Sequence, residues 1–352
     1  MSTGPDNARE QELLAAAQSG DEGAFARLVE PYRGELQAHA YRMVGSLHDA
    51  EDAMQEALLR AWRGIARFEG RSSLRSWLYT ITTNSSLRLI ERRPKRVLPI
   101  DLGPPADPHG EVGTPVAESV WIEPYPNERF AAEGTELSPE ASYEQRESVE
   151  LAFTAAMQHL PPLQRAALIM TDVLGYSPGE VAEVLDATPA SIYSALQRAR
   201  KATSERLPEP SQLRTREGLG EDHIKDVVDK FMEAWESADV EQLSSLLTMD
   251  CDLVMPPWAE WFQGRDAVLD FLPRGPFRAG RRWKLVPTRA NGQPAMGAYW
   301  FGGDGALHAE GIIVLSFGAS GQISQIASFR DPDLFSKFGL PRAMDSEGSS
   351  DQ

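Results

Sequence analysis

The chain has 352 residues, of which 41% are hydrophobic, and its 52 acidic and 35 basic residues give a net charge of −17. This length favours two or three domains. The single cysteine, Cys251, excludes intrachain disulfides and cysteine-based metal sites, and we expect it in the core. Because no apolar run could span a bilayer and no signal peptide is recognisable, we expect a cytoplasmic protein without membrane contact.

Residues 10–96 have the pattern of a small helical bundle. Apolar residues recur every three or four positions in the stretches 25–36, 50–65 and 74–81. Three amphipathic helices of this kind bury their apolar faces against one another.

Charge within this bundle is sorted along the chain. The second helix opens with acidic residues, whereas Arg60 to Arg96 include ten basic and two acidic residues, a net charge of +8. Trp62 and Trp77 lie on the apolar faces and are expected in the core, while Phe68 and Tyr79 are free to meet a base. Cations with stacking rings are typical of single-stranded nucleic-acid surfaces, and a solvated basic face is the alternative.

Residues 97–137 are predicted to be an acidic linker rich in proline and glycine. From residue 97 to 150 there are twelve acidic and two basic residues, a net charge of −10. The apolar exception is Trp121–Pro126, with the sequence WIEPYP, which can dock like a short extended ligand. A non-specific acidic spacer is the alternative.

Residues 138–207 are predicted to contain a helix-turn-helix. The sequence SPGE at 177–180 is a capping box with proline at the first helical position, and Thr188-Pro189 starts a second helix in the same way. Two short helices joined by a tight turn place the second helix in the DNA major groove.

Residues 222–340 have helices first and strands later, which is an α+β order. The patterns predict helices near 224–235, 240–247 and 266–272, and strands near 283–288, 295–301, 310–317 and 322–329. The tail, 341–352, is predicted to be disordered.

Taken together, residues 10–207 resemble extracytoplasmic-function sigma factors of the sigma-70 type. The most specific stretches are GDEGAFARLVEPYRGEL, DAEDAMQEALLRAW, FEGRSSLRSWLYTITTN and the run from LPPLQRAALIM to SALQRARKA. The resemblance implies two all-α sigma domains, at 10–96 and 138–207, which bind core RNA polymerase and promoter DNA without enzymatic activity.

The resemblance also implies roles for individual residues. The helix that binds the β′ clamp helices of polymerase would present Asp49, Asp52, Gln55 and Glu56. The surface that reads and melts the −10 element would include Arg67, Phe68, Arg71, Ser72, Ser73, Tyr79, Asn84, Arg88, Arg92 and Arg93. The second sigma domain, which meets the β flap, would read the −35 element with Thr188, Ser191, Tyr193, Ser194, Gln197, Arg198, Arg200 and Lys201.

The acidic linker fits this family, whose linkers thread into basic polymerase channels that otherwise hold nucleic acid. The linker is longer than most in the group. It resembles a subfamily with a WIEPYP-like segment and an additional C-terminal domain.

Residues 222–340 resemble the SnoaL-like branch of the cone-shaped NTF2-like fold, through FMEAWESADVEQLSSLLTMDCDLVMPP and FQGRDAVLDFL. That cone encloses a pocket, for which the candidate residues are Asp252, Met255, Trp258, Trp261, Trp300 and His308. The set is more apolar than an acid–base site, so a packing role is favoured, a small-molecule ligand is the alternative, and no catalysis, cofactor or metal is expected.

The end of this domain resembles the regulatory tail of fused sigma factors at Asp331, Pro332 and Asp333. We expect the domain to regulate the sigma modules, and a simple cap on the cone is the alternative. Two rival functions remain open: a helix-turn-helix regulator that acts without polymerase, and a DNA-targeting front end on a small-molecule isomerase or cyclase.

Overall fold

The computed structural model describes residues 5–116, 120–131, 150–278 and 281–345. Contacts divide them into two compact units. The helical unit contains residues 5–95, 129–131 and 156–206, and the C-terminal unit contains the remainder. Within the described residues, no helix is both long and apolar enough to cross a membrane.

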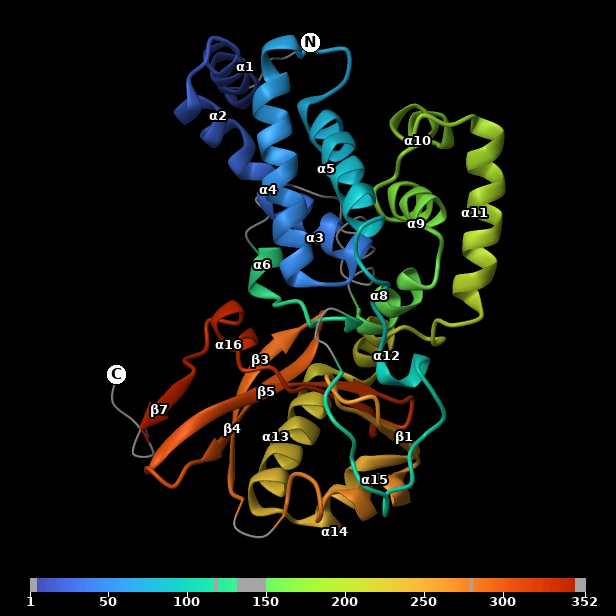
Figure 1. Cartoon of the computed structure of the whole chain (residues 1–352), viewed down its shortest axis with the longest axis vertical. Helices are drawn as coiled ribbons and strands as arrows, with labels where there is room; N and C mark the ends of the chain where they lie inside the picture. The colour runs from blue at the N-terminus through green and yellow to red at the C-terminus, as the bar shows by residue number, and fades with distance from the viewer. Residues whose placement is uncertain (1–4, 117–119, 132–149, 279–280, 346–352) are drawn as a thin grey trace. The chain divides into compact units, whose positions relative to one another are not determined.

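The first half of the helical unit is a bundle around α3, α4 and α5 (Figure 1). Side-chain oxygens of Ser46 and Ser73 cap α4 and α5, and Gly45 ends α3 in the left-handed conformation. The helices are α1 (Pro5–Gln18), α2 (Glu22–Val29), η1 (Glu30–Tyr32), α3 (Arg33–Val44), α4 (Leu47–Gly64), η2 (Ile65–Arg67) and α5 (Leu74–Ile90). The predicted bundle is therefore present.

The second half of the helical unit contains the predicted helix-turn-helix. Ser177 and Glu180 form the expected capping box at α10, and Thr188 caps α11 through its side-chain oxygen. The elements are α6 (Glu128–Ala131), α8 (Leu151–Gln158), α9 (Pro162–Leu168), the π-helical η5 (Ile169–Val173), α10 (Pro178–Val184) and α11 (Pro189–Ser204), with Leu151–Ala155 of α8 belonging to the C-terminal unit.

A buried arginine joins the two halves of the helical unit. Arg165, on α9, donates hydrogen bonds to the backbone oxygens of Met43, Gln158 and Leu160 and to the side chain of Gln158. Burial lowers the pKa of Arg165 to about 10. The Gln158 amide in turn donates to the Arg42 backbone oxygen at 3.4 Å. These bonds satisfy carbonyls at the end of α3, where a cation is favoured by the helix dipole.

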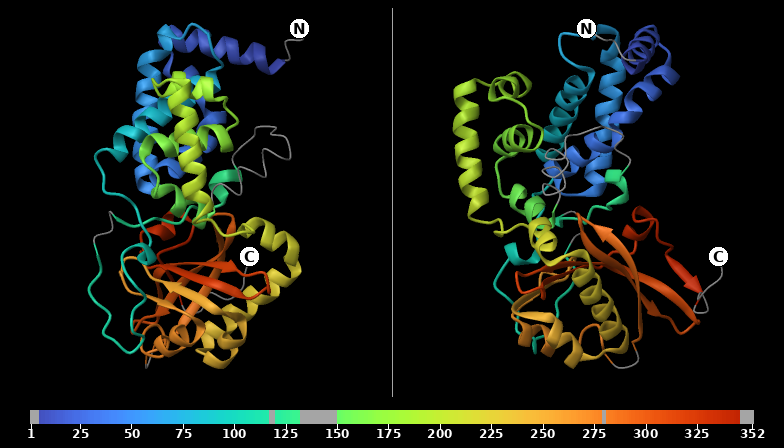
Figure 2. Two further views of the ribbon diagram at one scale, coloured as in Figure 1. Left: turned by 90° about the vertical axis from the view of Figure 1, so that its right-hand side faces the viewer. Right: turned by 180° about the vertical axis from the view of Figure 1, so that it is seen from behind.

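The C-terminal unit is a curved sheet with helices against one face (Figures 1 and 2). Among the described residues the strand order is β2-β1-β6-β5-β4-β3, and β7 pairs with β5. The strands are β1 (Leu247–Val254), β2 (Trp261–Gln263), β3 (Trp283–Ala290), β4 (Gln293–Phe301), β5 (Ala306–Phe317), β6 (Ile323–Phe329) and β7 (Ala343–Asp345). The helices are η3 (Pro99–Asp101), α12 (Gln212–Leu219), α13 (Glu221–Ser237), α14 (Val240–Leu246), α15 (Arg265–Phe271) and α16 (Leu334–Lys337).

Alternating side chains give this sheet two apolar faces. The inner core, between the sheet and α13 to α15, includes Phe231, Leu253 and Cys251, and it confirms the expected burial of the cysteine. The outer core contains Ile122, Leu151 and Tyr299, and thus receives apolar residues from outside the sheet. The α+β cone predicted from the sequence is confirmed.

The disordered tail predicted for 341–352 is wrong for residues 343–345. They form β7, whose register places Met344 opposite Leu307 and Ala343 opposite His308 of β5. Pairing with an otherwise unpaired strand edge satisfies backbone groups that the sequence pattern does not reveal. The rest of that prediction, 346–352, lies outside the described residues.

Replacing Gly45 by alanine tests the junction between the two halves of the helical unit. Its φ is +74°, and an added Cβ would lie 2.8 Å from the Gln158 side chain. We expect Gly45→Ala to lower the free energy of unfolding by about 2–3 kcal/mol, since backbone strain and loss of the Gln158 and Arg165 bonds combine. Urea unfolding measures it.

The matched control is Gly175→Ala, because Gly175 has a φ of +73° and open space around the added Cβ. Only the strain of about 1 kcal/mol remains there. Equal losses in the two variants would contradict the role given to the junction.

Candidate functional site

The acidic face of α4 is engaged by arginines from other segments. Arg93 lies 3.2 Å from Asp52 and 3.7 Å from Asp49, and Asp49 is only 2% exposed. Arg129, on α6, pairs with Glu51 at 2.8 Å. The predicted polymerase residues Asp52, Gln55 and Glu56 reach the surface, whereas Asp49 is nearly buried.

Two findings here go beyond the sequence prediction. Arg93 was expected on the DNA surface, and the structure places it against two predicted polymerase residues. Glu51 was not among the predicted polymerase-binding residues, although it lies on the same helix as Asp52. Its carboxylate forms the ion pair with Arg129. The acidic run at 49–56 was the signal that pointed to it.

Tyr79, expected to be free to meet a base, is fully buried, and that expectation is wrong. Its hydroxyl donates to Glu35 at 3.1 Å, and Glu35 also accepts a bidentate bond from Arg75. Arg75 lies 4.8 Å from the centre of the Tyr79 ring, and Tyr176 contacts that ring from its edge. Burial raises the pKa of Tyr79 well above its ordinary value. The helical period alone did not reveal this polar cluster.

The remaining predicted −10 residues form a largely exposed basic surface. Trp62 and Trp77 are half-buried, not fully in the core, and Phe68 stacks on Trp77 with ring centres 5.0 Å apart. Ser73 also caps α5, and Arg71 pairs with Glu69 at 2.8 Å. Asn84 is half-buried, and the exposed members are Arg67, Arg71, Ser72, Ser73, Arg88, Arg92 and Arg93.

The predicted recognition helix α11 has one buried and one exposed face. Ile192, Ala195, Leu196 and Ala199 are buried in the unit. Tyr193 is 62% exposed, and Arg200 pairs with Asp172 at 2.6 Å. All eight predicted −35 residues are exposed: Thr188, Ser191, Tyr193, Ser194, Gln197, Arg198, Arg200 and Lys201. This geometry leaves them accessible to a DNA groove.

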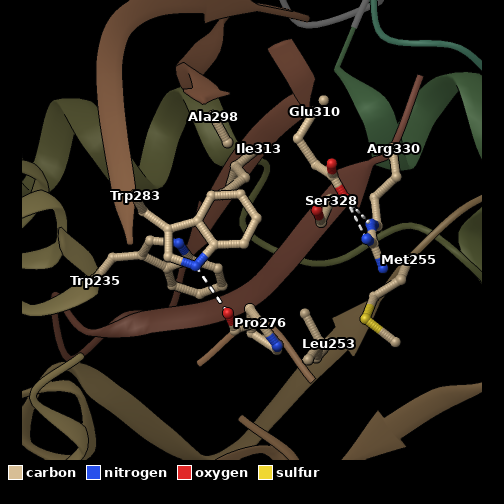
Figure 3. A pocket seen from close by; sticks show the side chains of 11 residues that line it. Trp235, Leu253, Met255, Pro276, Trp283, Ala298, Glu310, Ile313, Ser328 and Arg330 are labelled. Carbon is tan, nitrogen blue, oxygen red and sulfur yellow. Dashed lines mark hydrogen bonds and ion pairs between the residues drawn. The ribbon is translucent and has the colours of Figure 1, made fainter. Parts of the chain in front are cut away.

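The C-terminal unit contains a mainly apolar pocket with a charged side (Figure 3). Indole rings of Trp235 and Trp283 face Glu310, Ser328 and Arg330 across it. The other lining residues are Leu253, Met255, Pro276, Ala298, Gly311 and Ile313. Of the six candidates named from the sequence, Met255 lines this pocket.

The other five candidates lie elsewhere in the C-terminal unit. Trp258 stacks under the Arg330 guanidinium at 4.4 Å, and Trp300 stacks on His308 with ring centres 5.3 Å apart. Trp261 belongs to the outer core, and Asp252 pairs in register with Gln263 and Gln325. Strand alternation separates Asp252 from its neighbours Cys251 and Leu253, which face the inner core.

Glu310 and Arg330 are the charged residues that line the pocket, and Arg281 joins them by binding Glu310. Glu310 binds Arg330, with a bond of 3.0 Å from Nε, and binds Arg281 at 2.8 Å. The Arg281 guanidinium also lies 4.5 Å from the centre of the Trp283 ring. One carboxylate thus forms ion pairs with two arginines.

The WIEPYP segment of the linker packs on the outer face of the sheet. Ile122 and Tyr125 are fully buried, and Trp121 is 3% exposed. Tyr125 and Asn291 exchange hydrogen bonds of 2.8 Å, from the Tyr125 backbone N–H to the Asn291 side chain and from the Asn291 N–H to the Tyr125 oxygen. The sequence WIEPYP therefore docks as the extended ligand that its composition suggested.

Further bonds hold the linker before and after this segment. The indole N–H groups of Trp258 and Trp261 donate to the backbone oxygens of Gly113 and Gly103 at 3.1 and 2.9 Å. Next to α8, buried Glu150 accepts bonds from the backbone of Gln212 and Leu213. The sequence did not predict these contacts, because they join segments about 60 to 160 residues apart.

The predicted regulatory residues lie beside the docked linker. Asp331 lines a small cavity together with Trp121, Ile122, Glu123 and Pro124. Burial raises the pKa of Asp331, and its side chain accepts a bond from the Asp333 N–H at 2.8 Å. Asp333 pairs with Arg342 at 2.6 Å, and Pro332 lies between the two aspartates in sequence.

Three family models match the chain in order. Residues 28–96 match sigma-70 region 2, residues 150–202 match sigma-70 region 4, and residues 228–326 match the SnoaL-like domain. In the described residues, no cluster of three or more potential metal ligands is present.

Similar proteins agree with this order of domains. The chain is 40% identical over 332 residues to the ECF RNA polymerase sigma factor SigG of Mycobacterium tuberculosis, covering 92% of this chain and 85% of that protein. It is 28% identical over 199 residues to the RNA polymerase sigma-H factor of Pseudomonas aeruginosa, covering 56% and 94%. The crystal structure of the M. tuberculosis extracytoplasmic function sigma factor SigJ has the same fold, with a TM-score of 0.57 at 22% identity, covering 90% and 100%.

Replacing Asp252 by asparagine tests whether its charged carboxylate lowers the free energy of unfolding. Burial and the nearby Asp250 raise the pKa of Asp252 to about 6, and among the described residues one of its oxygens has no hydrogen-bond partner. A raised pKa means that the stabilising neutral form is lost as pH rises through about 6. We expect Asp252→Asn to raise the free energy of unfolding by about 1 kcal/mol at pH 7.5 and by less at pH 5.

Calorimetry at the two pH values measures the effect. Asp229→Asn is the control, since Asp229 is 60% exposed in a helical ion pair with Lys225. A loss of stability in Asp252→Asn at pH 7.5 would show that the carboxylate has a favourable partner.

Proposed function

Because the chain belongs to the extracytoplasmic-function RNA polymerase sigma factors, we propose that its C-terminal domain regulates promoter use by holding the linker between the two sigma regions. The chain itself is a transcription-initiation factor and not an enzyme. It directs RNA polymerase to promoters through its sigma-70 regions 2 and 4. This membership removes the rival of a regulator that acts without polymerase.

We assign residues 10–96 to polymerase binding and −10 recognition, 97–137 to the linker, and 138–207 to −35 recognition. Asp52, Gln55 and Glu56 suit basic partners such as the β′ clamp helices, since they are accessible. The exposed side of α11 suits the −35 major groove, with the β flap as the polymerase partner of this region. Residues 222–340 form the regulatory domain.

The docking of WIEPYP carries the proposal. Ile122 belongs to the outer core of the C-terminal domain, and Trp121 and Tyr125 of the same segment are also buried, so releasing the segment exposes part of that core. The same domain also holds the start of region 4, where the Leu151 N–H donates to Gln293 at 3.2 Å. The C-terminal domain therefore binds the chain at two points, the WIEPYP segment and Leu151.

Promoter recognition requires a more open arrangement than the free helical unit has. The −10 and −35 elements are about 25 base pairs apart, which is roughly 85 Å of B-DNA. In the free protein α9 packs on α3 and α5, so the helices of regions 2 and 4 are in contact. We infer that polymerase binding separates regions 2 and 4 and draws the linker off the sheet. The contacts of the linker with the C-terminal domain, called the hold below, oppose this step.

Replacing Ile122 by aspartate tests the hold. A carboxylate in place of a fully buried apolar side chain cannot stay on the outer core without a large desolvation cost. We expect Ile122→Asp to raise promoter-dependent transcript yield at least threefold with purified core polymerase at limiting sigma factor.

The control is Val112→Asp, because Val112 lies in the same linker and is 41% exposed. It adds the same charge without disturbing the outer core. Equal transcript yields from Ile122→Asp and the native chain, with both folded by circular dichroism, would defeat the proposal.

Tyr193 provides a test of −35 recognition. We expect Tyr193→Ala to weaken binding to a cognate promoter fragment about tenfold, because a base-contacting side chain is worth about 1–3 kcal/mol. Stability should change little, since the ring is 62% exposed. Ser204→Ala, at the far end of α11, is the control.

The cognate fragment comes from sequencing transcripts made with the native chain. Titration by fluorescence anisotropy on that fragment and on a scrambled −35 version measures the effect. Equal weakening on both fragments would mean that Tyr193 does not read the sequence.

A further inference from the structure

The inner pocket of the C-terminal domain has an apolar body and one cationic side. Trp235 and Trp283 provide flat aromatic walls, and Leu253, Met255 and Ile313 complete the apolar lining (Figure 3). Its enclosed volume is about 30 Å³ within a void of about 430 Å³ that opens to solvent. The enclosed part has room for about two water molecules, so a ligand of one ring would lie in the open part of the void with its polar end toward the enclosed part.

The charges at the pocket do not balance. Among the described residues, Arg281 and Arg330 share the carboxylate of Glu310, which leaves one positive charge in excess. The three side chains are only 13%, 27% and 18% exposed, so solvent screens this excess weakly. A buried excess cation favours an anionic ligand, and guanidinium groups bind carboxylates with particular geometric fit.

A second feature of the pocket points to a ligand with an acceptor atom. Trp235 is 3% exposed, and within the part of the chain that the structure describes its indole N–H has no hydrogen-bond partner. Buried donors are almost always paired, so an unpaired one in a pocket wall calls for an acceptor. A carboxylate supplies acceptors, whereas an ammonium group supplies none.

Arg330 connects this pocket to the linker. Its guanidinium binds Glu310 inside the pocket and lies 4.4 Å from the centre of the Trp258 ring. The Trp258 indole N–H donates to the Gly113 oxygen of the linker, and the Gly113 N–H donates to Glu260 at 2.8 Å. A displacement of Arg330 toward the pocket removes the cation from the ring that holds the linker.

We propose that the pocket binds a small aromatic carboxylate, which draws Arg330 inward and loosens the hold on the linker. The binding site stands on the pocket alone, and its effect on transcription rests on the proposed regulatory function. The ligand class follows from the aromatic walls, the excess cation and the unpaired indole donor. Neutral and cationic analogues of the same shape have no negative charge that could pair with the excess positive charge of the pocket.

Calorimetric titration of the full-length chain tests the ligand class. The probes are benzoate, benzyl alcohol and benzylamine, and we expect benzoate to bind at least tenfold more tightly than the other two. Arg330→Met should weaken benzoate at least tenfold. The control is Arg282→Met, because Arg282 stacks on Phe301 at 4.6 Å and does not line the pocket.

Benzylamine binding as tightly as benzoate, or equal benzoate affinities for Arg330→Met and Arg282→Met, would overturn the assignment.

Hydrogen exchange of the full-length chain tests the effect on the linker. The reporters are the N–H groups of Ala106, Gly113 and Val116, which bond to Trp261, Glu260 and Pro257. Saturating benzoate should speed their exchange at least threefold, while α13 stays unchanged. In Trp258→Phe, which lacks the bond to Gly113, benzoate should still bind but change this exchange less than 1.5-fold. Unchanged exchange in the native chain at saturation would overturn the coupling.

The two proposals fail separately. If benzoate does not bind but Ile122→Asp raises transcription, the pocket assignment fails and the regulatory hold stands. If benzoate binds and loosens the linker but Ile122→Asp leaves transcription unchanged, the hold has no regulatory effect and the binding site stands.

Discussion

The burial of Ile122 and Tyr125 on the outer face of the sheet is the interaction on which this account depends. A strand surface with apolar residues on both faces needs a cover on each, and α13 to α15 cover the inner one. Full burial of each such side chain contributes about 1.5–3 kcal/mol. The linker is therefore part of the core of the C-terminal domain, and its release has a free-energy cost that other contacts can offset.

Charge sorting explains how a chain of net charge −17 serves a DNA-binding function. Arg60 to Arg96, around α5, include ten basic and two acidic residues, and the end of α11 adds Arg198, Arg200 and Lys201, whereas α4 opens with acidic residues and the linker is strongly acidic. Arg93 and Arg129 cover part of the acidic face of α4 in the free protein. Basic partners must compete with these arginines, so binding exchanges one set of ion pairs for another.

Sequence reasoning predicted the features that local patterns determine. The capping box at Ser177, the Thr188 cap and the α+β order follow from neighbouring residues, and all were confirmed. Contacts between distant segments were not predictable in this way. The burial of Tyr79 against Glu35 and the pairing of Met344 with β5 depend on long-range packing that no periodicity reports. For the same reason, Met255 is the one of the six pocket candidates that lines the pocket, where Glu310 and Arg330 also lie.

The central claim is that the linker lies on the C-terminal domain in the free protein and leaves it on polymerase. Hydrogen exchange at Asn291 and Tyr125 measures this most directly, because the Asn291 N–H bonds to the Tyr125 oxygen and the Tyr125 N–H bonds to the Asn291 side chain. The account predicts slow exchange at both amides in the free chain and exchange at least tenfold faster in the complex with core polymerase. Equal protection of both amides in the two states would contradict it.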